Sequence, residues 1–278
     1  MRLALILIII VLILMFFTIV RQGFSKKEKR DWWNGNYFVQ KNVKMDYDGN
    51  IQAKIDQEWE NYTSQKLPKG FIKWSVENRI KTLDNFLKGK PGPPRLAGPH
   101  NGIVASFGKK RDDSNFSLNN AVKGMGFLPK KKKIKEIITL LEETIDADFP
   151  KKLKILKQLY SNSETNFSKD KQVSLELYTH PKHETQTFLN QISRPVSTIV
   201  FLDIPSFKLK TITRLLHPRN PNLTDYEKDI VKFTNLIHSY FHGKFDKDFV
   251  TVVYSVIEVY DNSPKKGARG TRLKPPLP

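Results

Sequence analysis

Residues 222–260 read NLTDYEKDIVKFTNLIHSYFHGKFDKDFVTVVYSVIEVY, and this stretch carries the strongest fold signal in the chain. Apolar residues between 230 and 240 recur with the spacing of one helical face. Thr224 followed by Glu227 predicts a capping box at the start of this helix. The β-branched and aromatic residues of 249–260 then predict a long strand. A helix followed by a strand of this length predicts a domain in which helices and strands are separate layers.

The segments that precede this stretch add more strands and helices. Short apolar or alternating runs at 102–107, 173–177, 198–202 and 207–213 predict strands, and one-sided apolar spacing at 134–145 and 153–160 predicts helices. The expected fold class is therefore α+β, with antiparallel or mixed strands packed on one long helix. We place this domain at 102–262 and a basic, proline-rich tail at 263–278, and we see no internal repeat.

Residues 90–101 are the clearest boundary in the sequence. Four prolines and two glycines occur among residues 90–99. Proline removes a backbone donor and disrupts both helices and central strands, so this segment predicts a linker. Before it, apolar residues spaced four apart at 51–59, and a second set at 72–83, predict two amphipathic helices. We interpret 23–89 as a juxtamembrane segment and helical stalk.

The amino terminus contains an uncharged apolar run from Leu3 to Val20. A helix needs about 20 apolar residues to cross a bilayer, so residues 1–22 predict a transmembrane anchor. A cleaved signal peptide is the alternative, but the run is longer than a usual signal core, and Arg21 precedes the best cleavage site. Basic residues concentrate after the run, which predicts an outside N-terminus and a C-terminal domain facing the cytosol or an equivalent interior.

Charge and cysteine content limit the classes of partner. The 278 residues hold 47 basic and 28 acidic side chains, which gives a net charge of +19, and they include no cysteine. The missing cysteines exclude disulfides, cysteine-based zinc sites and thiol nucleophiles. The positive charge predicts an anionic partner, which we take to be lipid headgroups of the bilayer, an acidic protein or nucleic acid.

Basic residues gather in two clusters beyond the membrane flank. As candidate contacts with an anionic partner we name Lys130, Lys131, Lys132, Lys133, Lys135, Lys265, Lys266, Arg269 and Arg272. A solvated helix face and a charged chain end are the plain alternatives for these clusters. The tail also presents Arg272, Pro275 and Pro278 with the spacing of a ligand for an SH3 or WW module.

Motifs for chemistry are weak in this sequence. His238 and His242 lie one helical turn apart, and His180 with His183 could add ligands, but no glutamate follows His238 as in a metalloprotease motif. Residues 146–148 (Asp-Ala-Asp) resemble the metal-binding element of glycosyltransferases, although the predicted orientation opposes that function. Residues 124–126 (Gly-Met-Gly) are too short to bind a phosphate group. We therefore predict no cofactor and no metal, and we assign no catalytic residue.

These features together predict a single-pass, membrane-anchored tethering or scaffold protein that binds an anionic partner through a basic surface. An apolar terminus, basic patches and an absence of cysteine also suit a virion membrane protein of a large DNA virus, although no family motif accompanies this layout. The alternative is a membrane-anchored enzyme whose pocket lies in the C-terminal α+β domain. A concave pocket with converging polar groups would favour the enzyme.

Overall fold

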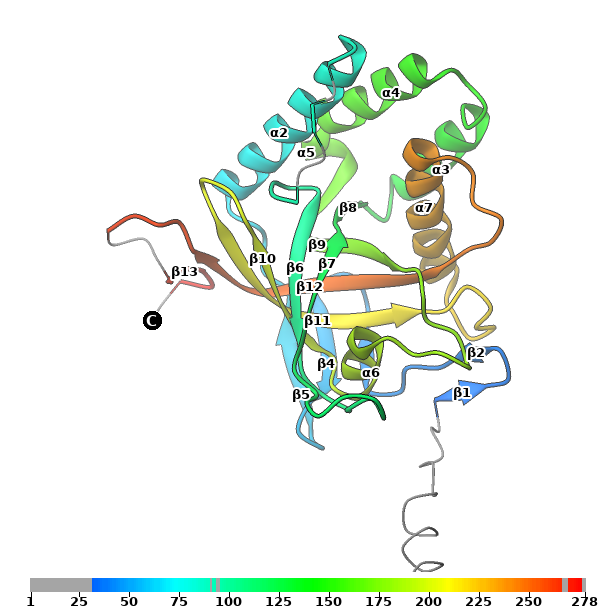
Figure 1. Cartoon of the computed structure of the whole chain (residues 1–278), viewed down its shortest axis with the longest axis vertical. Coiled ribbons are helices and arrows are strands. Elements are labelled where there is room, and N and C mark those ends of the chain that lie inside the picture. Colours follow the sequence, from blue (N-terminus) through cyan, green and yellow to red (C-terminus); the bar gives the residue numbers. More distant parts are fainter. Residues whose placement is uncertain (1–31, 91, 94–95, 267–269, 277–278) are drawn as a thin grey trace, which may run out of the picture. The chain divides into compact units, whose positions relative to one another are not determined.

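A strongly curled antiparallel sheet of eight strands lies at the centre of the fold (Figure 1). The structure, a computed structural model, describes residues 32–90, 92–93, 96–266 and 270–276. Seven strands follow the order β7-β6-β10-β11-β12-β9-β8, and the eighth, β13, pairs with β12. The bounds are β6 Asn101–Ser106, β7 Asn119–Gly124, β8 Gly126–Pro129, β9 Phe167–Glu176, β10 Val196–Phe201, β11 Phe207–Leu216, β12 Val250–Asp261 and β13 Thr271–Lys274.

One bend in the chain, at Met125 between β7 and β8, closes the curled sheet. β7 pairs with β6 at one end of the strand order, and β8 pairs with β9 at the other. A Cβ atom on Gly102 would lie 2.7 Å from Ile199 Cγ2 and 3.1 Å from Met125 Cγ, so the strand beside the bend needs glycine. The 2.6 Å ion pair between Lys123 and Glu176 links β7 to β9. The chain bend and this ion pair therefore close the sheet, and among the described residues no hydrogen-bonded ladder joins β7 to β8.

A polar network and helix α6 (Gln186–Ser193) fill one face of the closed sheet. Gln191 Nε2 donates hydrogen bonds to Ser197 Oγ at 3.1 Å and to Tyr254 OH at 3.4 Å. Thr213 Oγ1 donates to the same serine at 3.1 Å. All four side chains are buried. Buried polar groups are costly unless they are paired, so these hydrogen bonds fix α6 in one position against the strands.

Helix α7 (Asp225–His242) packs against β9 and β12, as the stretch 222–260 predicts. The predicted capping box is present: Thr224 Oγ1 accepts from the backbone N–H of Glu227, and the glutamate side chain accepts from the threonine backbone. Phe233 and Val253 are buried at 2% and 0% exposure. Helix α3 (Ile134–Glu143) packs on the same helix. The strongest sequence signal therefore marks a true contact between helix and sheet.

Residues 51–59 form most of β4 (Asn50–Lys54), the turn after it and the first residue of β5 (Trp59–Thr63), so the helix predicted there is wrong. With β3 (Val43–Met45), β4 and β5 make a separate three-stranded antiparallel sheet. Ile51 and Ala53 are buried with Ile212 of β11, whereas the intervening Gln52 is exposed. The fourfold spacing that indicated a helix arises by coincidence, because burial against the main sheet selects alternate residues of β4.

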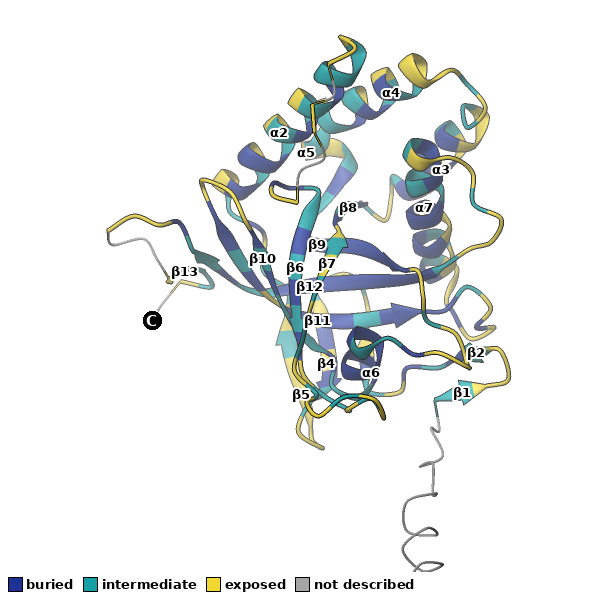
Figure 2. Cartoon of the chain, in the orientation of Figure 1, coloured by how far each residue is buried: buried dark blue, intermediate teal, exposed yellow. Residues whose placement is uncertain are grey.

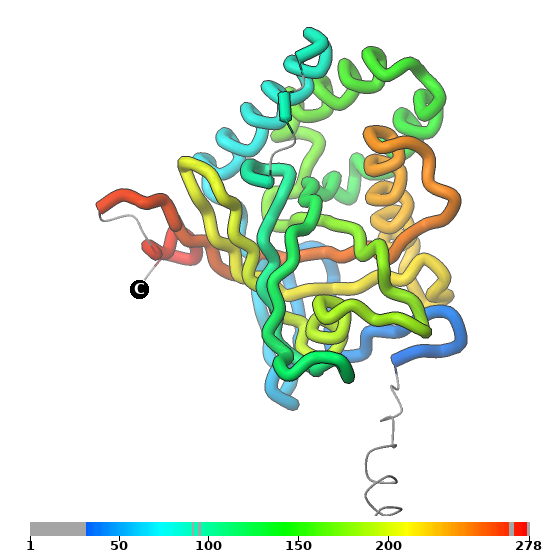
Figure 3. Tube along the Cα trace, in the orientation of Figure 1, coloured from blue at the N-terminus to red at the C-terminus, as the bar shows by residue number. Residues whose placement is uncertain are grey.

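The predicted helical stalk is also wrong, because its helix packs on the sheet. α2 (Lys69–Leu87) lies beside α4 (Phe149–Ser161), and the tube in Figure 3 shows these distant segments side by side. Phe71 and Trp74 contact Phe201 and Phe207, with ring centroids 5.2–5.8 Å apart. The described residues hold six helices, so the strands do not pack on a single long helix as predicted. The remaining elements are α5 (Ser163–Asn166) and a two-stranded pair, β1 (Trp33–Asn34) and β2 (Tyr37–Phe38). The α+β class itself is what the structure shows.

The prediction of a single-pass membrane protein needs correction. Among the described residues, no helix combines the length and apolar character that crossing a bilayer requires. α2, the longest of them, carries charged residues along its exposed side. The transmembrane and signal-anchor assignments, and the outside-to-inside localisation derived from them, are therefore not supported. The run from Leu3 to Val20 that suggested them lies outside the described residues.

Candidate functional site

The lysine run predicted as the binding surface spans the turn between β8 and α3 and reaches into α3, where Lys135 lies. Lys132 and Lys135 are exposed. The other three lysines are engaged: Lys130 donates to the backbone oxygen of Glu164, Lys131 lies 3.5 Å from Asp48, and Lys133 lies 2.6 Å from Glu136. Two of these partners are carboxylates that offset positive charge. The run is therefore a weaker anion-binding surface than its sequence indicates.

The basic tail is partly incorporated into the main sheet. Tyr260 and Asp261 of β12 pair with Arg272 and Thr271 of β13. The Arg272 guanidinium lies 3.9 Å from Glu258, while Lys265 and Lys266 are exposed. Pro275 follows the strand, and Arg269 and Pro278 lie outside the described residues. The basic residue of the proposed SH3 or WW ligand is thus held in a strand, whereas such modules bind a free polyproline helix.

The candidate metal ligands do not converge. His238 Nδ1 lies 2.7 Å from the backbone oxygen of Thr234, and burial lowers its pKa. His180 and His183 lie in an exposed turn, paired through their backbones. Within the described part of the chain, no group of three or more His, Asp or Glu side chains is arranged to hold a metal ion. His238 and His242 are positioned mainly by the packing of α7.

The two short motifs have structural roles. Asp148 is the N-cap of α4, and its carboxylate accepts a hydrogen bond from the backbone N–H of Lys151 at 2.7 Å. An acidic residue at this position satisfies a free N–H group and favours the helix dipole. Gly124 and Gly126 flank the bend that closes the sheet. Helix capping and chain geometry therefore account for both motifs.

A larger basic surface, which the sequence reasoning missed, lies on the helix pair α2 and α4. Residues in α4 include four lysines and no acidic side chain, and α2 contributes three exposed lysines. We define the helix-pair surface as Lys69, Lys73, Lys81, Lys88, Lys151, Lys154 and Lys157. Lys88 is the C-cap of α2, and Lys152 of α4 is left out because its amino group lies over the Tyr240 ring. The four lysines among residues 151–157 were the available signal, but they do not form a continuous run.

Ion pairs offset little of the charge on the helix-pair surface. Lys157 lies 2.6 Å from Asp84, and Lys73 lies 4.0 Å from Glu77 with both side chains more than 60% exposed. These are the two acidic residues of the pair of helices. Figure 2 shows exposed residues along the outer sides of α2 and α4, away from the sheet. An exposed, rigid and mostly uncompensated layer of lysines suits contact with an anion.

Arg79 fixes this helix pair to the bend that closes the sheet. Its guanidinium donates to the backbone oxygens of Pro99 at 2.6 Å and Met125 at 2.7 Å, and it faces the rings of Phe127 and Tyr160. The side chain is 2% exposed. A buried guanidinium is stable only when its donors are paired, and here carbonyl groups and aromatic faces replace a carboxylate. Arg79 thus determines where α2 lies.

His100 is a neutral partner of this arginine. Its Nδ1 atom lies 3.2 Å from the Arg79 guanidinium, which can only donate, so this nitrogen must be the acceptor. Burial, together with the nearby charges of Arg79 and His242, lowers the pKa of His100 to about 3. Protonation would remove the acceptor and place a second positive charge beside the guanidinium. The seam beneath the helix-pair surface is therefore sensitive to acid.

We predict that replacing His100 with glutamine weakens the acid dependence of stability. The folded pKa of about 3 lies below the ordinary value of 6.5, so the unfolded chain binds the proton more readily. The contribution of neutral His100 to the free energy of unfolding is complete above pH 6.5 and is lost as the pH falls towards 3. Each pKa unit of difference corresponds to about 1.4 kcal/mol. Urea denaturation between pH 3 and 7 measures this slope.

The exposed His180 supplies the matched control, because His180→Gln should leave the acid dependence unchanged. Identical pH profiles for the parent protein and His100→Gln would contradict the assigned neutral role of His100.

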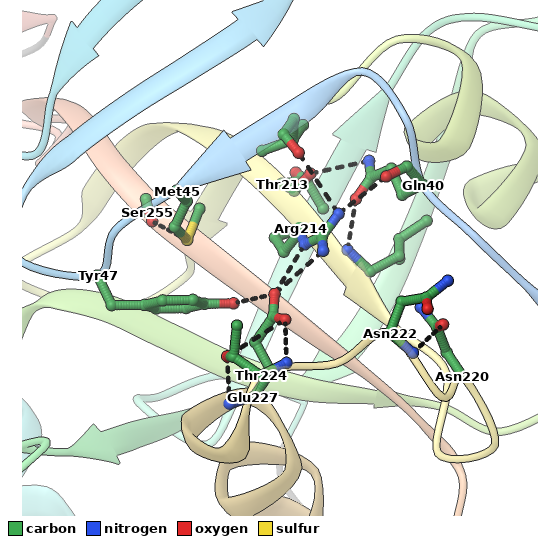
Figure 4. Close-up of polar contacts among 12 residues, drawn as sticks. Gln40, Met45, Tyr47, Thr213, Arg214, Asn220, Asn222, Thr224, Glu227 and Ser255 are labelled. Atoms are coloured by element: carbon green, nitrogen blue, oxygen red, sulfur yellow. Dashed lines mark hydrogen bonds and ion pairs between the residues drawn. The ribbon is translucent and has the colours of Figure 1, made fainter.

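A second buried network holds the amino-terminal strands against β11 and α7 (Figure 4). Glu227 accepts from Arg214 at 3.0 Å and from Tyr47 OH at 2.9 Å, and Gln40 accepts from the backbone N–H of Leu215 at 2.7 Å. Burial and the nearby Glu227 raise the pKa of Tyr47 well above its ordinary value. Since the carboxylate also caps α7, we interpret this network as structural.

Comparison with known proteins gives no assignment of family or activity. No protein-family model matches the sequence, and no curated protein matches it. The function must therefore be argued from the described residues alone.

Proposed function

We propose that this protein is a non-catalytic binding module that recognises an anionic partner through the helix-pair surface. The observation that carries this proposal is the lysine layer on α2 and α4, where two carboxylates face seven exposed or partly exposed lysines. Lysine clusters attract polyanions by releasing counterions, and rigid helices present the charges together. The net charge of +19 adds a long-range attraction. The rival prediction of an enzyme gains no specific support from the polar networks described above.

We predict that neutralising four lysines of this surface weakens binding of a polyanion. The variant combines Lys73→Gln, Lys81→Gln, Lys151→Gln and Lys154→Gln, and duplex DNA serves as the probe. The logarithm of the binding constant falls linearly with the logarithm of the salt concentration, and each phosphate contact contributes about one to the magnitude of that slope. Loss of four contacts should therefore reduce the magnitude of the slope by about four. Fluorescence anisotropy across a salt series measures the slope. Exposed lysines contribute little to stability, so the melting temperature should stay nearly constant.

The lysine run and the tail provide matched comparison variants. One variant neutralises Lys130, Lys131, Lys132, Lys133 and Lys135, and the other neutralises Lys265, Lys266 and Arg272. We call the variant with four neutralised lysines on α2 and α4 the helix-pair variant. Both comparison variants should retain more DNA binding than it does, because their cations are partly paired or lie near β13. The proposal is wrong if either of these variants loses binding while the helix-pair variant keeps it.

A further inference from the structure

An apolar groove with a volume of about 420 Å³ lies between the three-stranded sheet and the main sheet. Ile55 and Tyr62 line it from the side of β4 and β5, and Ala105 and Val196 line it from β6 and β10. The same hydrophobic cluster that joins the two sheets borders this groove, with Ile212 at its centre. The groove therefore continues the packed contact between the two sheets, but the apolar lining of the groove is open to solvent.

Large apolar side chains are exposed in the lining of this groove and in the chain segments next to that lining. Phe107 and Leu118, which line the groove, are 50% and 66% exposed. Phe116 in the same loop is 76% exposed, and Val122 on β7 is 49% exposed. Single exposed apolar residues are ordinary, but a group of them beside an apolar groove indicates a binding surface. Gln186 of α6 holds the loop: its Nε2 donates to the backbone oxygen of Lys109, and its Oε1 accepts from the backbone N–H of Arg111.

Positive charge borders one end of the groove. Lys210 and Glu258, which both line it, form a 2.6 Å ion pair, and Arg272 lies 3.9 Å from the same carboxylate. Lys208 and Lys210 also flank the Tyr260 ring, at 4.6 and 5.2 Å from its centroid. Lys210 thus contacts both Glu258 and the Tyr260 ring, while Arg272 lies near the carboxylate and Lys208 near the ring. The charge at this end favours a partner that carries acidic side chains beside its apolar ones.

We infer that this groove binds an amphipathic segment of an acidic protein. Its apolar face would occupy the groove beside Phe107 and Leu118, and its acidic side chains would face Lys208, Lys210 and Arg272. Amphipathic helices that lie in apolar grooves are a common mode of peptide recognition. A second copy of this chain is the less favourable occupant, because two chains of charge +19 repel each other. Together with the helix-pair surface, this site would let one scaffold engage two partners.

The test uses the full chain and a labelled synthetic peptide of about 16 residues, enough for four helical turns. Leucines recur on one face of the peptide and glutamates cover the other. Two control peptides have the same composition in shuffled order, or lysine in place of glutamate. Fluorescence anisotropy should show the amphipathic acidic peptide binding at least about tenfold more tightly than either control, a difference of about 1.4 kcal/mol.

Protein variants then locate the binding site. Leu118→Asp places a charge at the groove and should weaken binding by about tenfold or more. Tyr178→Asp is the matched control, since Tyr178 is 70% exposed but does not line the groove. The helix-pair variant should keep the preference for the amphipathic peptide over the shuffled one, which separates this inference from the proposed function.

Three outcomes would overturn the inference. Equal binding of the amphipathic and shuffled acidic peptides would mean that charge alone causes the attraction. Equal losses in Leu118→Asp and Tyr178→Asp would place the site elsewhere. Self-association that Leu118→Asp abolishes, measured by sedimentation, would make a second copy of this chain the occupant.

Discussion

Replacing Arg79 with methionine should lower the free energy of unfolding by about 2–6 kcal/mol, because two buried backbone oxygens lose their donor. The substitution leaves the backbone oxygens of Pro99 and Met125 without their donor, and each unpaired buried group costs about 1–3 kcal/mol. It also removes the cation between the rings of Phe127 and Tyr160. Because these groups border the bend that closes the sheet, the substitution should destabilise the main sheet as well as α2.

Two further variants make this result specific. Lys81→Met changes an exposed lysine on the same helix and should alter stability by less than about 0.5 kcal/mol. Arg79→Lys keeps the charge but cannot reach both oxygens with a planar fork, so its stability should fall between those of the parent and Arg79→Met. Urea denaturation measures all three. Equal stability of Arg79→Met and Lys81→Met would show that the arginine is not essential to the seam.

A chain that begins at Gly102 should fail to fold, whereas one that begins at residue 32 should melt cooperatively. The proline-rich boundary suggested the opposite, namely that 102–262 folds independently. Removing α2 uncovers Phe201 and Phe207, and removing β4 uncovers Ile212. Each fully buried large apolar side chain contributes about 1.5–3 kcal/mol, and total stability is usually about 5–15 kcal/mol.

Calorimetry and binding of a hydrophobic dye provide the measurements. The shortened chain should show no cooperative transition and strong dye binding. As a control, removal of residues 264–278 deletes β13, which pairs only with the last three residues of β12, and should preserve cooperative melting. A cooperative transition in the chain that begins at Gly102 would contradict this prediction and support independent folding of 102–262.

The sequence alone located five strands of the main sheet, namely β6, β9, β10, β11 and β12, and the longer helices. Residues 222–260 determine α7 and β12 because capping, helical spacing and β-branched residues all agree within one short segment. The predicted helices at 134–145 and 153–160 correspond to α3 and α4 for the same reason. The net charge, and hence the expectation of an anionic partner, also follows from composition. These properties are local or additive, and therefore need no knowledge of distant contacts.

Only the tertiary structure decided which residues act together. The strand at 51–54 has a sequence that suits a helix, but burial of Ile51 and Ala53 against Ile212 selects the extended form. Part of the charge of the lysine run is offset by Asp48, which is more than 80 residues away from its partner Lys131. The helix-pair surface exists because α2 and α4, far apart in the chain, pack side by side around Arg79. Contacts between distant segments set these features, and the spacing of residues along one segment does not encode them.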